Sequence, residues 1–396
     1  MEEDLIRKAE LALGGGVRLP EGYVLPFRIS RSTAGPGAGL GAAVLAFGRY
    51  RVKKPVSYSA GEFELVVDGD RLSLTRGGEP FLDEVRFEPV VRHSPDQAFF
   101  NLDPRCMFHC AYCSSPLLDP SEDKHLSTER IMEMLEESAS QHGFGCISFT
   151  SGVVGSIQQT VDRIADAVRA AKARFPDVPI GVEPYVSTRE QILQLKDAGA
   201  EEIKINVESP SREVFGRVCP DLDYDGIWEM LEAAVGIFGR GKVASNMIFG
   251  MGETDEQMER AMDRLCAMGA VPGIRALRTN RINLGSIGGI LEGVDRATPE
   301  RAVRLAMKQK ECMERHGFDS MPLRTMCMGC GCCDLVPFVD FRSFRPRGSW
   351  TGPRPGARTT CICHPRWAPR IRRASGSTGG APCRASGGAC RTRTGC

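Results

Sequence analysis

The sequence predicts an α/β protein whose main domain is a partial (βα)6 barrel of the TIM type. From about residue 96 onward, short apolar runs alternate with amphipathic stretches of helical period, which is the pattern of parallel strands joined by crossover helices. Six such units can be counted, whereas a closed barrel of this type contains eight. We therefore expect a parallel sheet that remains open along one side.

The elements of this domain, which we place at residues 96–318, follow one another at regular spacing, and each strand is expected to lead into one helix. The strands are predicted at residues 98–102, 146–150, 180–184, 202–207, 243–249 and 274–278. The helices are predicted at residues 127–140, 157–175, 188–198, 224–238, 255–268 and 299–316.

Residues 1–95 depart from this pattern and are predicted to form a small α+β cap. Its expected elements are a helix at residues 3–13 and strand-like runs at 42–47 and 63–74. Asp68-Gly69 predicts the turn of a hairpin within the last of these runs. The Gly-rich stretch 30–39, which contains Arg31, could bind an anionic substrate group through its backbone amides, or could form a flexible connection.

Composition favours a cytoplasmic protein with a large hydrophobic core. The chain has 396 residues, of which 42% are hydrophobic, and this is enough for a large core. No apolar run approaches the ~18 residues that span a bilayer, and the acidic, amphipathic start lacks the features of a secretory signal. We therefore expect no membrane partner. In a reducing compartment, clusters among the 16 cysteines favour metal ligation over disulfides.

Charge is divided unevenly along the chain. Residues 342–396 contain twelve arginines and five cysteines but no Lys, Asp, Glu, Asn or Gln. Subtracting these twelve charges from the formal net charge of +1 leaves residues 1–341 at −11, which argues against a nucleic-acid partner. We interpret the tail as a GC-rich coding sequence translated out of frame. Its arginines alone would also permit an RNA-binding arm, and in both cases we expect it to be disordered.

Three closely spaced cysteines, Cys106, Cys110 and Cys113, fall in the predicted loop after the first strand of the barrel. Three thiolates cannot complete the tetrahedral shell of one metal ion, but they can hold three irons of a [4Fe-4S] cluster and leave the fourth iron open to another ligand. The alternative is a zinc site that also uses His109 or a distant cysteine. The spacing therefore predicts a metal centre in this loop.

With aromatic Tyr112 before its last cysteine, this motif resembles the signature of the radical S-adenosylmethionine (radical SAM) superfamily. The resemblance implies that Cys106, Cys110 and Cys113 hold a catalytic [4Fe-4S] cluster whose open iron binds SAM. It also implies that an electron from a low-potential donor of the ferredoxin or flavodoxin type cleaves SAM to methionine and a 5′-deoxyadenosyl radical, which abstracts a substrate hydrogen.

Further contacts to SAM are expected just after the strands, because barrel enzymes gather their functional side chains at the carboxyl ends of strands. The run Gly-Met-Gly-Glu-Thr at residues 250–254 resembles the Gly-Leu-Gly-Glu-Thr run of biotin synthase. The same run could also serve as a strand-to-helix turn in which Thr254 or Asp255 caps the helix. The residues that the resemblance assigns to SAM are Tyr112, Thr150, Ser151, Gly152, Asn206, Glu208, Gly250, Gly252 and Glu253.

Charged residues at two other strand ends are candidates for contacts in the pocket. Glu183 ends the third predicted strand and either faces SAM or the substrate, or forms a structural salt bridge. Arg278 is favoured over Arg275 as the ligand of a substrate carboxylate, because Arg278 lies nearer the end of its strand.

A second cysteine group follows the last predicted helix, in a segment that we place at residues 319–341. It comprises Cys327, Cys330, Cys332 and Cys333. We expect it to bind a second, auxiliary iron–sulfur cluster; a structural zinc site and a redox dithiol are the alternatives. Four cysteines of residues 1–341 belong to neither group and are expected to be ordinary buried thiols, namely Cys146, Cys219, Cys266 and Cys312.

The resemblance covers residues 96–340 and looks most like the biotin-synthase-related branch seen in archaea and anaerobes, which includes lipoyl-synthase-like members. With an auxiliary cluster as the sulfur source, it implies sulfur insertion into a small-molecule or acyl-carrier-bound substrate. Two alternatives remain open. One is another radical reaction, such as dehydrogenation, peptide modification or rearrangement, with an electron-relaying second cluster. The other is a noncatalytic iron–sulfur or zinc protein.

Overall fold

The computed structural model describes residues 3–31, 41–119, 121, 125–326 and 328–341. These residues belong to one compact unit, whose boundary lies at residue 344. Most of the Gly-rich stretch, Cys327 and the tail from residue 342 onward lie outside the described residues, so the predictions made for them are not addressed below.

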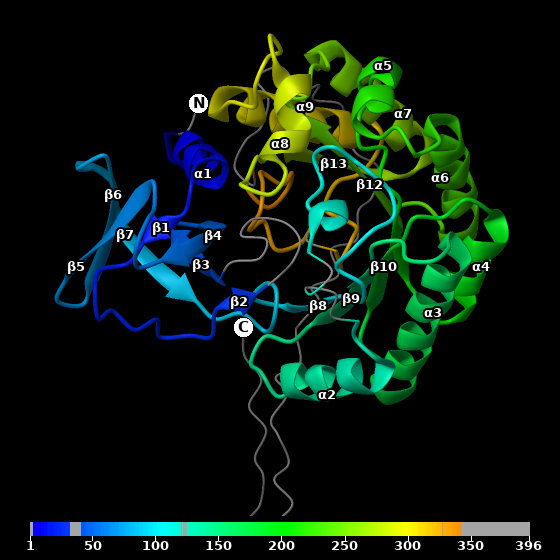
Figure 1. Cartoon of the computed structure of the whole chain (residues 1–396), viewed down its shortest axis with the longest axis horizontal. Coiled ribbons are helices and arrows are strands. Elements are labelled where there is room, and N and C mark those ends of the chain that lie inside the picture. The colour runs from blue at the N-terminus through cyan, green and yellow to red at the C-terminus, as the bar shows by residue number, and fades with distance from the viewer. Residues whose placement is uncertain (1–2, 32–40, 120, 122–124, 327, 342–396) are drawn as a thin grey trace, which may run out of the picture. The chain divides into compact units, whose positions relative to one another are not determined.

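A six-stranded parallel sheet with helices on its outer side forms the larger part of this unit (Figure 1). Its strands pair in the order β13-β12-β11-β10-β9-β8, each parallel to its neighbours. Within the described part of the chain, β8 and β13 do not pair with each other, so the sheet stays open. The prediction of a partial (βα)6 barrel is therefore confirmed. The strands are β8 (Gln97–Asn101), β9 (Cys146–Thr150), β10 (Ile180–Glu183), β11 (Glu202–Lys204), β12 (Val243–Phe249) and β13 (Val271–Ala276).

Each strand from β8 to β13 is followed by a helix whose apolar face packs on the sheet. The main helices are α2 (Thr128–Ala139), α3 (Ile157–Arg174), α4 (Arg189–Asp197), α6 (Tyr224–Phe238), α7 (Asp255–Met268) and α9 (Pro299–Arg315). In each of them a Ser, Thr or Asp at the N-cap accepts a hydrogen bond from the first turn, which explains why the helix begins there. Two shorter helices that were not predicted are α5 (Arg212–Val218) and α8 (Leu284–Ile287).

The amino-terminal residues form a helix and a small, mostly antiparallel β-barrel. The helix α1 (Glu3–Leu13) has the predicted bounds, and the hairpin of β5 and β6 has its predicted turn, with Asp68 opposite Arg71. The strands pair in the order β2-β3-β4-β1-β5-β6-β7, and β3 also pairs with β7, which closes the ring. They are β1 (Val17–Arg18), β2 (Ser30–Arg31), β3 (Gly41–Phe47), β4 (Tyr50–Ser57), β5 (Phe63–Asp68), β6 (Arg71–Arg76) and β7 (Glu79–Glu88).

The segment that follows α9 packs against the parallel sheet. The fully buried carboxylate of Glu202 accepts hydrogen bonds from the Thr325 backbone N–H (2.9 Å) and hydroxyl (2.7 Å), and Met326 N donates to Ser148 Oγ (3.2 Å). A Cβ atom on Gly181 would lie 2.1 Å from Thr325 Oγ1, so the absence of a side chain at Gly181 makes room for this segment.

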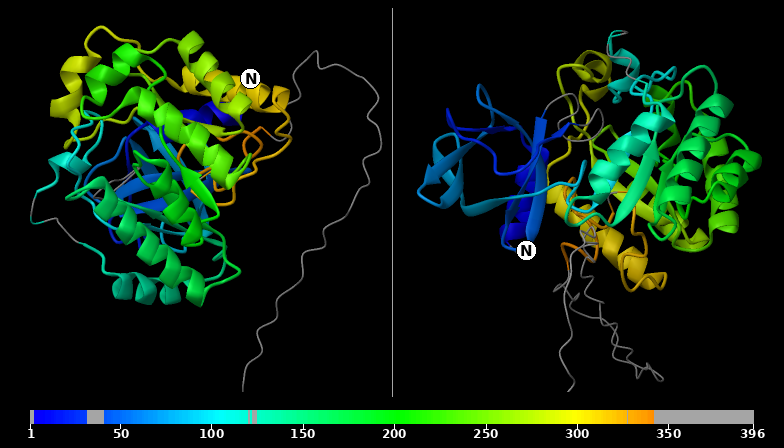
Figure 2. Two further views of the ribbon diagram at one scale, coloured as in Figure 1. Left: turned by 90° about the vertical axis from the view of Figure 1, so that its right-hand side faces the viewer. Right: turned by 90° about the horizontal axis from the view of Figure 1, so that it is seen from below.

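The same segment also contacts the amino-terminal part of the chain, which lies on the other side of it (Figure 2). Lys8 on α1 is buried and donates to Asp340 Oδ1 (2.6 Å) and to the Gly331 carbonyl (2.6 Å). Lys53 on β4 donates its backbone N–H to the Cys332 carbonyl (2.7 Å). Residues 325–326 and 328–340 are therefore held between the β-barrel and the parallel sheet.

Candidate active site

The first cysteine group lies in the loop that leaves the carboxyl end of β8. Backbone N–H groups donate to two of its thiols, from Val153 to Cys106 Sγ (3.3 Å) and from Ser115 to Cys113 Sγ (3.4 Å). Within the loop, Cys113 N also donates to the Cys110 carbonyl (2.9 Å). All three cysteines are partly buried. The loop thus presents three thiols from one short stretch of backbone.

The loop after β9 packs directly on this cysteine loop. Gly152 N donates to the Asp103 carbonyl (2.8 Å), and Ser151 Oγ donates to Asp103 Oδ2 (3.1 Å). A Cβ atom on Gly152 would lie 1.9 Å from the Arg105 carbonyl oxygen, a distance that no side chain can tolerate. Thr150 Oγ1 donates to the Glu183 carbonyl (3.0 Å). Residues 150–152 therefore support the cysteine loop sterically, and their contact with SAM stays a prediction.

Asp103 is the buried anchor of this contact. Its carboxylate pairs with Arg163 from α3 and with His125. Burial alone would raise the pKa of Asp103, but the hydrogen bonds from Arg163 and His125 outweigh it and hold this pKa below its ordinary value. The carboxylate is thus kept charged, and the start of the cysteine loop is tied to α3 and to the loop that carries His125.

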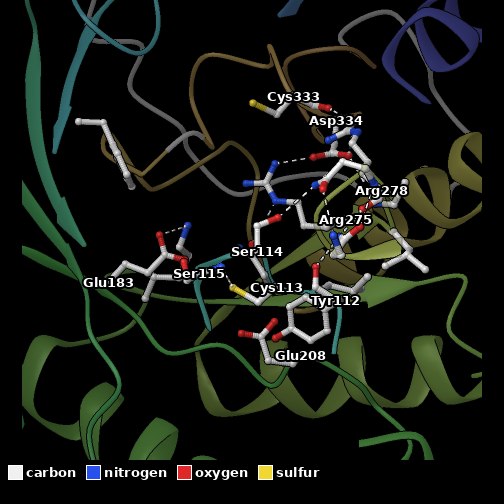
Figure 3. A pocket seen from close by; sticks show the side chains of 18 of the residues that line it. Tyr112, Cys113, Ser114, Ser115, Glu183, Glu208, Arg275, Arg278, Cys333 and Asp334 are labelled. Carbon is white, nitrogen blue, oxygen red and sulfur yellow. Dashed lines mark hydrogen bonds and ion pairs between the residues drawn. The ribbon is translucent and has the colours of Figure 1, made fainter. Parts of the chain in front are cut away.

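Polar side chains from the segment after β13, which includes α8, hold the other end of the cysteine loop. Asn283 Nδ2 donates to the Tyr112 carbonyl (2.7 Å), Ser286 Oγ donates to the Ala111 carbonyl (2.7 Å), and Asn280 Nδ2 donates to Ser114 Oγ (3.1 Å). Sequence reasoning missed these residues, because single Asn and Ser side chains in a loop carry no recognisable spacing. Figure 3 shows this part of the loop beside the end of β13.

The thiols of the first group are neutral as free groups. Burial raises the pKa of Cys106, and burial raises the pKa of Cys113 to about 11. A hydrogen bond with the Cys219 thiol, followed by burial, raises the pKa of Cys110. A bound cation reverses this preference, because metals bind the thiolate. With two thiols that accept backbone N–H bonds, this donor set fits a [4Fe-4S] cluster held by Cys106, Cys110 and Cys113.

His109, which the zinc alternative uses as a ligand, points elsewhere. Its Nδ1 lies 2.8 Å from Asp221 Oδ2, its backbone N–H donates to the same oxygen, and its side chain is 75% exposed. The hydrogen bond from His109 lowers the pKa of Asp221. The charged carboxylate therefore keeps His109 in this position.

A charged network lies at the carboxyl ends of β10 and β11. Buried Lys204 pairs with Glu183 Oε2 (2.9 Å), and Asn206 Nδ2 donates to Glu183 Oε1 (3.0 Å). Asn206 Oδ1 accepts from Asn246 N (3.1 Å), which links β11 to β12. The salt bridge predicted for Glu183 is therefore present. The side chain of Asn206 is hydrogen bonded to Glu183 and to the backbone of Asn246.

Glu208 ends this network in a strained backbone conformation. Its φ is 66°, a value that non-glycine residues rarely adopt and that is often found at functional sites. Burial raises the pKa of Glu208 to about 7; the nearby Glu183 also raises it, whereas hydrogen bonds from Tyr112 and Asn206 lower it. Burial also raises the pKa of Tyr112, so its phenol remains a donor.

These groups surround a cavity of about 310 Å³ (Figure 3). Tyr112 and Cys113 line it on the side of the cysteine loop, Glu208 lies on the side of β11, and Cys333 lines it from the second cysteine group. Of the residues predicted to bind SAM, Tyr112 and Glu208 thus line the cavity. The lining also contains Glu183, Lys204, Arg275 and Arg278.

The two arginines are held by Asp334, which follows Cys333 in the chain. Arg275 Nη1 lies 2.7 Å from Asp334 Oδ2, and Arg278 Nη2 lies 3.1 Å from Asp334 Oδ1 and 2.5 Å from the Cys333 carbonyl oxygen. Arg278 therefore reaches the cavity as predicted, but its guanidinium group binds the protein itself. A substrate carboxylate at this position would have to share it with Asp334.

The second cysteine group is described at Cys330, Cys332 and Cys333, all of which are buried. Cys330 and Cys332 pack with Val44 and Val90, away from the cavity. Among these three described cysteines, Cys333 lines the cavity. The identity of a metal bound by this group stays a prediction.

The turn after β12 has a structural explanation. The buried carboxylate of Glu253 accepts from Gly250 N (2.7 Å) and Met251 N (3.0 Å) and pairs with Arg301 of α9 (2.9 Å). Gly250 and Gly252 have φ of 99° and 116°, which favour glycine. Thr254 caps α7, as one of the two interpretations predicted. None of these residues lines the cavity, and their predicted contact with SAM stays a prediction.

A parallel partial barrel with three cysteines after its first strand defines a class of α/β domains built to hold a metal centre at the carboxyl ends of their strands. Residues 100–265 match the model of the radical SAM superfamily. This part of the chain is therefore a radical SAM domain, and its relatives include biotin synthases.

Individual relatives match at low identity. The biotin synthase of Macrococcus caseolyticus is 27% identical over 208 residues, which are 50% of this chain and 58% of that protein. The biotin synthase of Campylobacter concisus is 28% identical over 30% of this chain and 43% of that protein. Molybdenum cofactor biosynthesis protein moc-5 of Caenorhabditis elegans is 26% identical over 43% of this chain and 27% of its own length. These matches span less than two thirds of each relative.

Among solved structures, methylornithine synthase aligns with a TM-score of 0.45 and 14% identity over 59% of this chain and 74% of its own. Within the described residues, none of the helices is both long and apolar enough to cross a membrane.

Proposed function

We propose that this protein is a radical SAM enzyme that reductively cleaves SAM and inserts sulfur into its substrate. The observation that carries the proposal is a shared cavity, since Cys113 of the first cysteine group and Cys333 of the second line the same space. A substrate activated near one group could receive an atom from the other without leaving this cavity.

The residues of the first group have defined roles in this proposal. Cys106, Cys110 and Cys113 would hold three irons of a [4Fe-4S] cluster. Reduced by a ferredoxin-type or flavodoxin-type donor, that cluster supplies the electron that splits SAM into methionine and the 5′-deoxyadenosyl radical, which removes a substrate hydrogen. Glu208 and Tyr112 would bind polar groups of SAM from the wall of the cavity, where Glu208 is partly buried.

The second group would supply the sulfur. Cys327, Cys330, Cys332 and Cys333 would hold an auxiliary iron–sulfur cluster, whose sulfide is consumed when the carbon–sulfur bond forms. Turnover would then stop at about one product per auxiliary cluster, whereas an electron-relaying cluster would survive many cycles. The substrate would be a small molecule or an acyl group on a carrier, with its reacting carbon in the 310 Å³ cavity.

Iron and sulfide content test the two-cluster arrangement directly. Anaerobically reconstituted protein is compared with a variant that carries Ala at Cys327, Cys330, Cys332 and Cys333. We expect about eight irons per chain to fall to about four. About four irons in both proteins would show that the second cysteine group binds no iron–sulfur cluster. The proposal of sulfur insertion would then be contradicted.

SAM cleavage tests the first cluster. Cys106→Ala, Cys110→Ala and Cys113→Ala should each abolish the formation of 5′-deoxyadenosine under dithionite, whereas Cys146→Ala, a buried thiol on β9, should retain it. Retained cleavage in any of the first three variants would contradict the assignment.

A further inference from the structure

Four side chains capable of binding a metal meet between α7 and α9, outside the cavity described above. Asp263 and Cys266 lie three residues apart on α7, and Cys312 and His316 lie four residues apart at the end of α9. These spacings place both members of each pair on one side of their helix. The two helices pack against each other, so the pairs face a common point.

The ligand atoms are close together. Those of Asp263, Cys312 and His316 all lie within 4.8 Å of one another, and His316 Nε2 is 2.9 Å from Asp263 Oδ1. Cys266, whose thiol interacts with the Cys312 thiol, places a second sulfur beside these three ligand atoms. Within the described residues, these are the three His, Cys, Asp or Glu side chains whose ligand atoms all lie within 4.8 Å of one another.

Burial differs across the group in a way that suits a metal site. The two cysteines are almost completely buried, whereas the side chains of His316 and Asp263 are 24% and 50% exposed. The sulfur side is therefore closed by the protein, and the carboxylate side gives an ion a path from solvent. Arg315 also pairs with Asp263 (2.8 Å), but its side chain is 62% exposed and free to turn away.

We propose that Asp263, Cys266, Cys312 and His316 form a binding site for a divalent transition-metal ion of the zinc class, which joins α7 to α9. Two sulfurs, one imidazole nitrogen and one carboxylate oxygen are a donor set that Zn²⁺ prefers, whereas Mg²⁺ and Ca²⁺ require oxygen ligands. With bonds of about 2.0–2.3 Å, tetrahedral ligands lie roughly 3.5 Å apart. For Asp263, Cys312 and His316, closure from the present spacing needs shifts of about 1 Å, and the Cys266 thiol would turn toward them from its place beside Cys312.

Such an ion would have a structural role. With four protein ligands its coordination is complete, which distinguishes it from a catalytic zinc that keeps a position for water. The chain leaves α9 directly toward the segment that carries Cys333 and Asp334, so the ion would fix the helix from which that segment starts. Zinc should therefore raise the midpoint of thermal unfolding, because it binds the folded chain.

Zinc binding to the full-length, iron-reconstituted protein tests this site. The protein is equilibrated anaerobically with Zn²⁺, desalted and analysed for zinc, and the zinc-edge X-ray absorption spectrum reports the neighbouring atoms without interference from iron. We expect His316→Gln and Cys312→Ser each to lower the zinc content by one ion per chain, or to weaken binding at least about tenfold. The absorption difference should correspond to two sulfur and two nitrogen or oxygen neighbours.

The controls separate this site from the other cysteines. Cys146→Ser, which removes a buried thiol on β9, should leave the zinc content unchanged. His316 is partly exposed, so His316→Gln should keep its helical circular dichroism. Equal zinc content in the wild type and in both site variants would overturn the proposal, and so would a Cys266–Cys312 disulfide found by mass spectrometry in the anaerobic protein.

Discussion

Arg275 Nη1 lies 2.7 Å from Asp334 Oδ2, which joins the last strand of the parallel sheet to the residue that follows Cys333. Arg278 reinforces this contact from the carboxyl end of the strand, with bonds to Asp334 Oδ1 and to the Cys333 carbonyl. Because Asp334 is nearly buried, these bonds fix the position of Cys333 at the cavity rather than merely covering a surface.

We expect Asp334→Ala to destabilise the protein by about 3 kcal/mol, because it leaves two partly buried guanidinium groups without their anion. Urea unfolding of the anaerobic protein measures the loss, and the iron content should fall toward that of a single cluster. Asp319→Ala, at an exposed position, should stay within about 0.5 kcal/mol of the wild type. A fully stable Asp334→Ala protein would show that the arginines find other partners.

Gly152→Ala should prevent the cysteine loop from closing properly. The added Cβ atom would lie 1.9 Å from the Arg105 carbonyl oxygen, so the backbone of one of the two loops must move. We expect the iron retained by the first cluster to fall by at least about half, as measured by iron analysis and by 5′-deoxyadenosine formation. Gly236→Ala is the matched control, because a Cβ atom there meets no atom within 4 Å. Normal iron content in the Gly152 variant would refute the steric argument.

The barrel was predictable because its strands and helices differ in hydrophobic period, and this periodicity reflects burial. β9, β12, α6 and α7 have the predicted bounds. In contrast, β4 was missed because it contains Lys53 and Lys54, and both are buried. Lys54 Nζ donates to the carbonyls of Leu11 and Gly14, and these partners exist only in the folded structure.

In the candidate site too, local patterns were predictable from the sequence, whereas contacts between residues far apart in the chain were not. The spacing of Cys106, Cys110 and Cys113 identified the cysteine loop, because local spacing is visible in a sequence. The side chains of Asn280 and Asn283, which hold that loop, act across a distance in the chain that no local pattern records. Cys266 and Cys312 were expected to be ordinary buried thiols; their burial is confirmed, but their pairing across two helices was not predictable from spacing.

Glu253 offers a test of two roles that the sequence left open. Its buried carboxylate accepts two backbone N–H bonds and pairs with Arg301, so Glu253→Gln places an amide N–H₂ against donors. We expect a loss of about 3 kcal/mol in the free energy of unfolding, with little change in the SAM affinity of the folded protein. Equilibrium binding of SAM below the unfolding transition measures the second quantity.

Glu259→Gln, an exposed change on α7, the helix that follows this turn, is the control for this experiment and should alter neither quantity. If Glu253→Gln instead weakens SAM binding more than about tenfold while stability is retained, the predicted contact between Glu253 and the cofactor would gain support.

SAM binding should depend on pH through Glu208. Burial raises the pKa of this carboxyl group to about 7, so Glu208 is mostly charged at pH 8 and mostly neutral at pH 6. If its carboxylate binds a polar or cationic group of SAM, affinity should weaken by roughly tenfold as the pH falls across this range. Calorimetric titration of the reconstituted protein at each pH measures the change.

Two variants establish which group is responsible. Glu208→Gln cannot ionise, so its SAM affinity should be lower than that of the wild type at pH 8 and nearly constant down to pH 6. Tyr112→Phe removes the hydrogen bond that lowers the pKa of Glu208, so the midpoint of the pH dependence should move upward. An unchanged pH dependence in Glu208→Gln would assign the titration to another group and leave Glu208 without a role in SAM binding.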